Sequence, residues 1–184
     1  MALLAEYTVT AQPDRCLAEV YDSDAYLQDS AALEASREQV VAGNGYHLYL
    51  HSLQPAIAVD VIIRIWDEPQ TPPAHCEGST PVAIESTTAC LVINQLTFGP
   101  AGTMDLPRPG VYEGIAWWTG RHAAQARCST AGKCNIPLVV AHFLRARRSS
   151  TRRLDLAVGF AALGENSSLE DGEGRRGVGW SPVV

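Results

Sequence analysis

Long hydrophobic runs are absent from this sequence of 184 residues. No apolar stretch reaches the ~18 residues that a membrane-spanning helix needs, so the sequence predicts no membrane segment and no membrane partner. A secretory signal is also missing, because the short apolar start lacks a basic region and is followed at once by Glu6. We therefore expect a cytoplasmic protein.

Lysine is nearly absent, and basic residues are the minority charge. Lys133 is the only lysine among 14 basic residues, which face 20 acidic ones, so the formal net charge is −6. An acidic chain argues against nucleic acid as the main partner and fits a protein that meets a basic partner surface. With 46% hydrophobic and 18% charged residues, the composition is that of a globular protein.

Catalytic motifs are missing as well. The sequence holds no Gly-x-Ser-x-Gly elbow and no Gly-x-x-x-x-Gly-Lys phosphate loop, and its acidic residues are scattered. These absences predict no catalytic residue and no enzyme. A hydrolase whose residues meet only in space leaves no such motif, and it is kept as the third hypothesis.

The cysteines are odd in number: Cys16, Cys76, Cys90, Cys128 and Cys134. Without an export signal, reduced thiols are the default. Five residues separate Cys128 from Cys134. Zinc-ligand pairs are typically separated by about two to four residues, so we predict no metal and no cofactor. A disulfide that closes this loop is sterically easy and remains the alternative to two free thiols.

Short segments of alternating polarity fill most of the chain. They predict strands at 2–11, 15–21, 46–51, 57–66, 82–86, 90–98, 111–119, 136–147 and 154–160, and the short segments 39–41 and 103–106 lie beside turns. The segment 136–147 is apolar at both periods, so a helix is its alternative. Asp29 and Ser30 are suitable caps for a short helix over 31–38, with an ordered loop as the alternative.

Turns and connections separate these segments. Gly43-Asn44-Gly45 is typical of a hairpin, and the prolines of 67–81 indicate a surface loop. Residues 120–135 are expected to form a long connection. Nine or ten short strands and at most one short helix predict an all-β antiparallel sandwich, jelly-roll or immunoglobulin-like, over 1–163. The polar segment 164–184 is expected to be a flexible tail.

The predicted strand 46–51 places His47, Tyr49 and His51 on one face. Its two histidines would lie roughly 13 Å apart, from the ~3.3 Å rise per residue, which is too far for one metal ion to bridge. We interpret all three side chains as exposed polar residues.

The segment Leu106-Pro107-Arg108-Pro109-Gly110-Val111-Tyr112 combines a tight turn with the start of a strand. The prolines exclude a helix, and Gly110 can adopt a positive φ. A tyrosine two residues after this glycine is similar to the tyrosine corner of β-sandwiches, whose hydroxyl bonds to the backbone just upstream. We predict a structural corner at Gly110 and Tyr112. An ordinary turn before an amphipathic strand is the alternative.

Five arginines gather near the end of the last long apolar segment: Arg145, Arg147, Arg148, Arg152 and Arg153. Guanidinium groups bind phosphates and acidic partners well, so this is one candidate contact surface. The alternative is a solvated hairpin tip that protects strand ends from pairing.

The order of features between residues 47 and about 144 resembles a known family. A strand around Leu48, the segment Arg64-Ile65-Trp66-Asp67, a proline-rich loop, Leu91-Val92-Ile93, the turn before Tyr112 and Gly120-Arg121 follow one another. This order is similar to that of small bacterial jelly-roll proteins of the competence-protein-J type, which are nuclease inhibitors, and of related bacterial β-sandwich proteins.

The resemblance covers about half the chain and carries no site residue across. It implies a non-enzymatic protein that binds another protein, inhibitor or immunity-like. The alternative is a structural subunit of a larger assembly, such as a phage or secretion particle, which would form a homo-oligomer.

Overall fold

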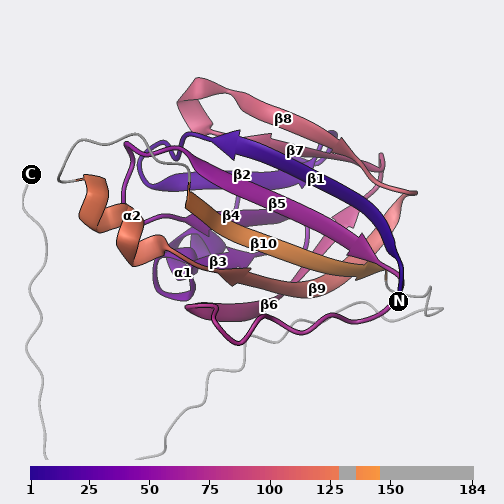
Figure 1. The fold of residues 1–184 in the computed structure, drawn as a ribbon. Helices are drawn as coiled ribbons and strands as arrows, with labels where there is room; N and C mark the ends of the chain where they lie inside the picture. Colours follow the sequence, from indigo (N-terminus) through magenta and orange to yellow (C-terminus); the bar gives the residue numbers. More distant parts are fainter. Residues whose placement is uncertain (129–135, 146–184) are drawn as a thin grey trace, which may run out of the picture. The chain divides into compact units, whose positions relative to one another are not determined.

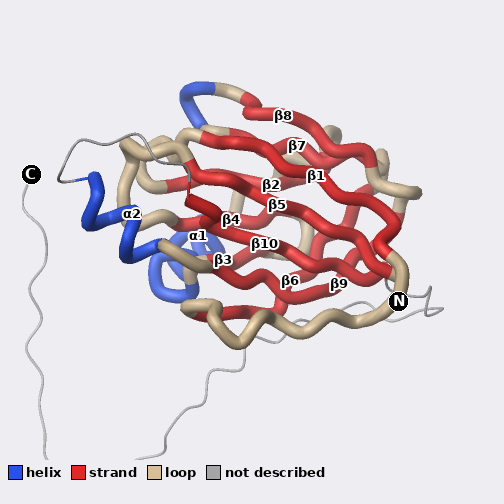
Figure 2. The backbone as a smooth tube through the Cα atoms, in the orientation of Figure 1, coloured by secondary structure: helices blue, strands red, loops and turns tan. Residues whose placement is uncertain are grey.

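Two five-stranded sheets make up the fold in the computed structural model, which describes residues 1–128 and 136–145. The strands of the first sheet are, in order, β1 (Leu3–Ala11), β5 (Val59–Trp66), β10 (Ile136–Arg145), β9 (Gly110–Trp118) and β6 (Gly78–Ser86). Those of the second are β3 (Val41–Gly43), β4 (His47–His51), β2 (Leu17–Asp22), β7 (Cys90–Asn94) and β8 (Pro100–Asp105). Figures 1 and 2 show the first sheet in front of the second.

All neighbouring strands are antiparallel except β5 and β10, which run parallel. The predicted all-β class is therefore confirmed. The structure also decides between the two interpretations of 136–147, because β10 is a strand in the interior of the first sheet.

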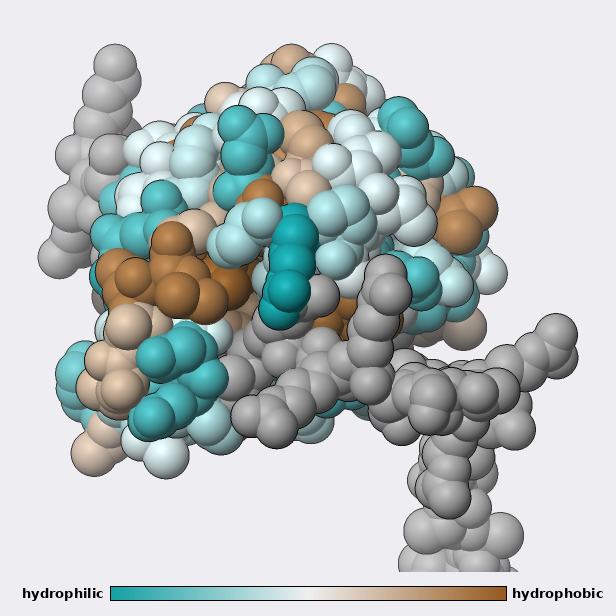
Figure 3. All heavy atoms as spheres, turned by 90° about the vertical axis from the view of Figure 1, so that its right-hand side faces the viewer, coloured by the Kyte–Doolittle hydropathy of each residue, from teal (hydrophilic) through white to brown (hydrophobic). Residues whose placement is uncertain are grey.

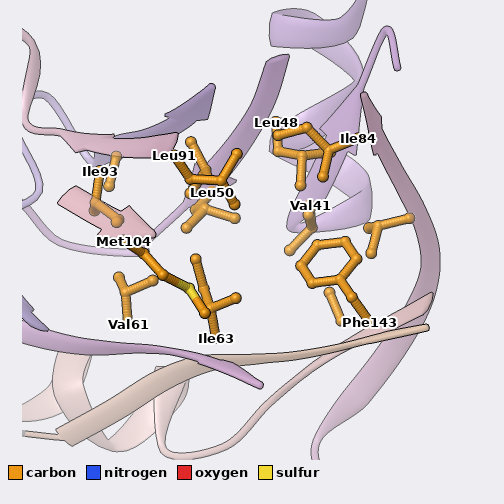
Figure 4. Close-up of a cluster of buried hydrophobic side chains, with 14 of the residues drawn as sticks. Val41, Leu48, Leu50, Val61, Ile63, Ile84, Leu91, Ile93, Met104 and Phe143 are labelled. Atoms are coloured by element: carbon orange, nitrogen blue, oxygen red, sulfur yellow. The ribbon is translucent and has the colours of Figure 1, made fainter. Parts of the chain in front are cut away.

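The hydrophobic core lies between the sheets and follows from the alternation in their strands. In β5, every second residue from Val59 to Ile65 is buried, and the residues between them are partly exposed. Because side chains alternate along a strand, one face of β5 is apolar throughout. It meets Leu91 and Ile93 of β7 and Leu50 of β4 (Figure 4).

The helix α1 (Ser30–Gln39) is the one that the capping residues predicted. The Asp29 carboxylate accepts hydrogen bonds from the backbone nitrogens of Ala31 (2.8 Å) and Ala32 (3.1 Å). This satisfies two of the donors that a helix N-terminus leaves without an internal partner. Ala32 and Ser36 form the buried face of the helix, which packs on β3 and β4.

Three local predictions need correction. Pro81 lies inside β6 rather than in the preceding loop, which is tolerated because β6 is an edge strand. A second helix, α2 (Arg121–Cys128), replaces the first part of the predicted connection, since its alanine, glutamine and arginine residues favour helix. The described part thus has one more short helix than predicted. A 3₁₀ turn, η1 (Leu96–Phe98), also ends the predicted strand 90–98 early.

Asp22 ties the end of β2 to the connection that carries the chain from one sheet to the other. Its fully buried carboxylate accepts hydrogen bonds from the Ser86 hydroxyl, from the Thr88 hydroxyl (2.7 Å) and from the Thr88 backbone nitrogen (3.0 Å). Because β6 belongs to the first sheet and β7 to the second, this carboxylate fixes the crossover between them.

The replacement Asp22→Asn is expected to lower stability at pH 7 by about 1–3 kcal/mol, because an amide nitrogen cannot accept these bonds. Burial raises the pKa of Asp22, but hydrogen bonds from Ser86 and Thr88 outweigh it and hold the pKa below its ordinary value. The folded-state pKa is thus below the unfolded value of about 3.9, so the contribution is present above about pH 4 and is lost as the pH falls through the folded pKa.

Urea unfolding of wild type and Asp22→Asn at pH 7 and pH 2.5 measures this effect. We expect the difference between the two proteins to shrink at the lower pH. The exposed Asp105→Asn variant is the matched control and should show little change at either pH. An Asp22→Asn deficit of the same size at both pH values would contradict the account.

Tyr112 lies at the start of β9 with a buried ring. Its hydroxyl donates a 2.5 Å hydrogen bond to the backbone carbonyl of Arg108, and Gly110 between them has a φ of 148°. This is the contact that the corner prediction requires. Tyr112→Phe should therefore cost about 1 kcal/mol, because the variant loses one buried hydrogen bond. The midpoint of chemical denaturation measures the loss, and an unchanged midpoint would refute it.

Candidate functional site

The outer face of the second sheet carries a set of buried or half-buried polar and aromatic side chains. Glu19 and Tyr21 of β2, His47 and Tyr49 of β4, and Asn94 of β7 alternate with residues that face the core. Leu17, Tyr49 and Ala32 pack together on this face, so α1 covers part of it. The loop 23–29, between β2 and α1, approaches the same face through Tyr26.

A carboxylate, an imidazole and an amide meet at the centre of this face. Glu19 is 1% exposed and His47 is fully buried. His47 Nε2 lies 3.5 Å from Glu19 Oε1, and Asn94 Nδ2 donates to Glu19 Oε2 at 2.8 Å. Burying a polar group is costly unless a hydrogen bond compensates it, and the Asn94 amide supplies one such bond to Glu19.

Three tyrosines surround the His47 ring. It stacks on Tyr49 at a centroid distance of 4.4 Å, with Tyr21 at 5.0 Å and Tyr26 at 5.3 Å. Tyr21 and Tyr26 also meet edge to face, a favourable arrangement of two rings. Burial raises the pKa of Tyr21 and of Tyr49, and the nearby Glu19 carboxylate adds to both shifts. These phenols are therefore neutral at neutral pH.

The interpretation of His47 and Tyr49 as exposed residues was wrong. Their positions on one strand face were correctly predicted, but α1 and Tyr26 of the loop 23–29 lie over that face. His51, at the end of the same strand, is partly exposed, and its ring lies 3.4 Å from the Arg121 guanidinium. Burial, together with that positive charge, lowers the pKa of His51.

Beside this cluster, three large apolar side chains are exposed: Tyr26 by 46%, Leu27 by 51% and Tyr46 by 38%. We call them the apolar patch. Asn44 joins the two turns that carry them. Its side chain donates to the Leu27 carbonyl at 3.0 Å and accepts from the backbone nitrogens of Tyr46 (3.0 Å) and His47 (2.9 Å).

Acidic residues outnumber basic ones in the segment that carries the apolar patch. Between residues 17 and 50 there is one basic side chain, Arg37, against Glu19, Asp22, Asp24, Asp29, Glu34 and Glu38. Arg37 is paired with Glu34 at 3.2 Å. Glu85 of β6 adds a further carboxylate, whose hydrogen bond with the Tyr46 hydroxyl raises the pKa of that phenol.

The residues predicted from the sequence as sites lie elsewhere. Gly110 and Tyr112 belong to the first sheet, where Arg145 at the end of β10 is in register with Tyr112. Arg147, Arg148, Arg152 and Arg153 lie outside the described residues, as do Cys134, the predicted strand 154–160 and the tail 164–184. Cys128 is the last residue of α2, and Cys76 and Cys90 are free thiols.

Within residues 1–128 and 136–145, no three histidine, cysteine, aspartate or glutamate side chains are placed to hold a metal ion. Neither helix in these ranges is long and apolar enough to cross a bilayer.

No family model matches this sequence, and no curated protein matches it either. Two solved structures share its fold. ComJ from Bacillus subtilis, an inhibitor of the DNA-degrading activity of NucA, matches with a TM-score of 0.54 and 10% identity, over 79% of this chain and 98% of ComJ. The product of crocagin biosynthetic gene J matches with a TM-score of 0.51 and 15% identity, over 80% of this chain and all of that one. The chain therefore has a fold similar to that of ComJ, as the family resemblance in its sequence predicted.

Proposed function

We propose that this chain is a non-enzymatic, inhibitor-like protein that binds another protein through the apolar patch. The observation that carries the proposal is the exposure of Tyr26, Leu27 and Tyr46 on two turns that are hydrogen-bonded to each other. Exposed apolar side chains that gather with a polar rim are typical of interaction sites, and tyrosine is enriched where binding energy concentrates.

The packing beneath the patch supports this proposal. Tyr26 rests on the rings of Tyr21 and His47, and the backbone nitrogen of Asp29 donates to the Tyr49 hydroxyl at 2.9 Å. The loop 23–29 is thus held at both its aromatic residue and its end. A surface that is ordered before binding loses less conformational entropy when a partner docks.

The fold similarity agrees with a binding role. ComJ inhibits a nuclease, and the similarity extends over 98% of its length. A fold alone does not fix a function, so the residues of the patch, rather than the similarity, define the contact proposed for this chain.

Affinity capture with the full chain, followed by reconstitution with the purified captured protein, tests this function. We expect a stoichiometric complex in calorimetry, and we expect the activity of an enzymatic partner to fall when it is bound. The double variant Tyr26→Ser/Leu27→Ser should weaken the complex at least about tenfold, as loss of central interface side chains does. The matched control is Leu3→Ser/Leu4→Ser, which removes exposed leucines elsewhere and should bind normally.

Failure of every purified candidate to bind, or binding that is indifferent to Tyr26→Ser/Leu27→Ser, would overturn the proposed surface. A complex that leaves an enzymatic partner fully active would retain the protein-binding role and remove the inhibitor role.

A structural subunit is the second candidate function, and one observation favours it. β1 is an outer strand of the first sheet, and its Leu3 and Leu4 are exposed. Figure 3 shows the side near the N-terminus, where hydrophobic patches interrupt a mainly hydrophilic surface. Exposed apolar residues on an outer strand can pair copies of a chain. Light scattering separates the two candidates, since a monomer favours the inhibitor and a ring or shell favours the subunit.

A further inference from the structure

The chemistry around the apolar patch indicates which kind of partner surface fits it. Each turn of the patch has a carboxylate near it: the exposed Asp24 is two residues before Tyr26 in the sequence, and Glu85 bonds to Tyr46. The nearest cation in the sequence, Arg37, is already paired with Glu34. The two carboxylates give the patch a negative character, which complements a positive partner surface.

The aromatic side chains narrow the choice of cation. Tyr26 exposes a ring whose other contacts are Tyr21 and His47, and Tyr46 combines an exposed ring with the Glu85 carboxylate at its hydroxyl. A guanidinium stacks on aromatic rings and forms bidentate hydrogen bonds with carboxylates, whereas an ammonium acts as a compact, strongly hydrated charge. Because Tyr46 presents an aromatic ring beside the carboxylate of Glu85, this part of the patch favours arginine over lysine.

We propose that the apolar patch and the carboxylates of Asp24 and Glu85 bind an arginine-bearing, basic surface of a protein partner. This inference rests on the proposed function and names the chemistry of the partner. In it, Tyr26 and Tyr46 stack on guanidinium groups, Asp24 and Glu85 accept their hydrogen bonds, and Leu27 contacts the apolar part of the same surface.

An NMR titration of the isotope-labelled full chain with nona-arginine tests the proposal. We expect the largest amide shifts at residues 24–27, 44–46 and 85, and an affinity that falls as salt rises. Nona-lysine should bind about threefold to fivefold more weakly, because it stacks less well on the rings. Nona-glutamate should cause no shifts in these residues.

Two double variants test whether binding depends on the position of the carboxylates or only on the total negative charge. Asp24→Asn/Glu85→Gln should weaken nona-arginine binding several-fold, whereas Asp67→Asn/Glu68→Gln, which removes two carboxylates next to the N-terminal amine, should leave it unchanged. Tyr26→Leu keeps an apolar side chain without a ring and should cost about threefold in affinity. Retention of dispersed amide signals establishes that each variant is folded.

Equal losses in the two charge variants, or shifts that map away from the patch, would overturn the proposal. If the captured protein binds through Tyr26 and Leu27 while nona-arginine does not bind the patch, the arginine proposal fails and the proposed function stands. If the captured protein does not depend on the patch, the proposed function itself fails.

Discussion

Replacement of Phe143 by alanine is expected to lower the free energy of unfolding by about 3–5 kcal/mol, the usual cost of deleting a buried aromatic ring. Phe143 is fully buried, and it lies in β10, an interior strand of the first sheet. Its ring points across the core toward Val41 of the second sheet (Figure 4). The alanine variant would leave a cavity between the sheets that their strands cannot collapse to fill.

Urea unfolding of Phe143→Ala measures this loss, and Phe98→Ala is the matched control. Phe98 lies in η1 with 63% of its surface exposed, so its removal should change stability by less than about 0.5 kcal/mol. Similar midpoints for the two variants would show that β10 does not close the core as described.

His47→Ala is expected to destabilise the protein by about 3 kcal/mol, because it deletes a fully buried ring that packs against three tyrosines. The variant would leave the Glu19 carboxylate with the Asn94 amide and without the imidazole. It would also remove the ring on which Tyr26 and Tyr49 rest. Binding at the apolar patch should therefore weaken as well, since Tyr26 is part of the patch and also packs on the His47 ring.

The control for this variant is His51→Ala, which changes a partly exposed histidine on the same strand. Its loss should cost less than about 1 kcal/mol. Thermal and urea unfolding of both variants provide the comparison. Equal destabilisation by the two replacements would contradict the distinction between a buried and a partly exposed imidazole.

Local features of the chain could be predicted because their causes lie within a few residues. The alternation of β5 fixes its buried face, Gly43-Asn44-Gly45 joins β3 to β4, and Asp29 caps α1. Pro81 was misplaced because its tolerance in β6 depends on the strand lying at a sheet edge, which the local pattern does not show. The same holds for α2, whose helix-forming residues sit among polar ones in what resembled a connection.

The candidate site could be predicted only in part, because its partners are far apart in sequence. Glu19 between the apolar residues Ala18 and Val20 was a visible signal, but Asn94, which donates to it, is 75 residues away. The burial of His47 depends on a loop whose path over the sheet is set by Tyr26 and by the Asn44 contact to Leu27. Such contacts follow from the tertiary fold, whereas periodicity shows only which face a side chain occupies.

The turns that hold Tyr26, Leu27 and Tyr46 are proposed to form the surface that binds a protein partner. Hydrogen–deuterium exchange of the full chain, alone and in complex with the captured protein, tests it directly. We expect binding to slow exchange in residues 23–29 and 44–46 and to leave β1 unchanged. Slower exchange confined to β1, with residues 23–29 and 44–46 unaffected, would contradict it.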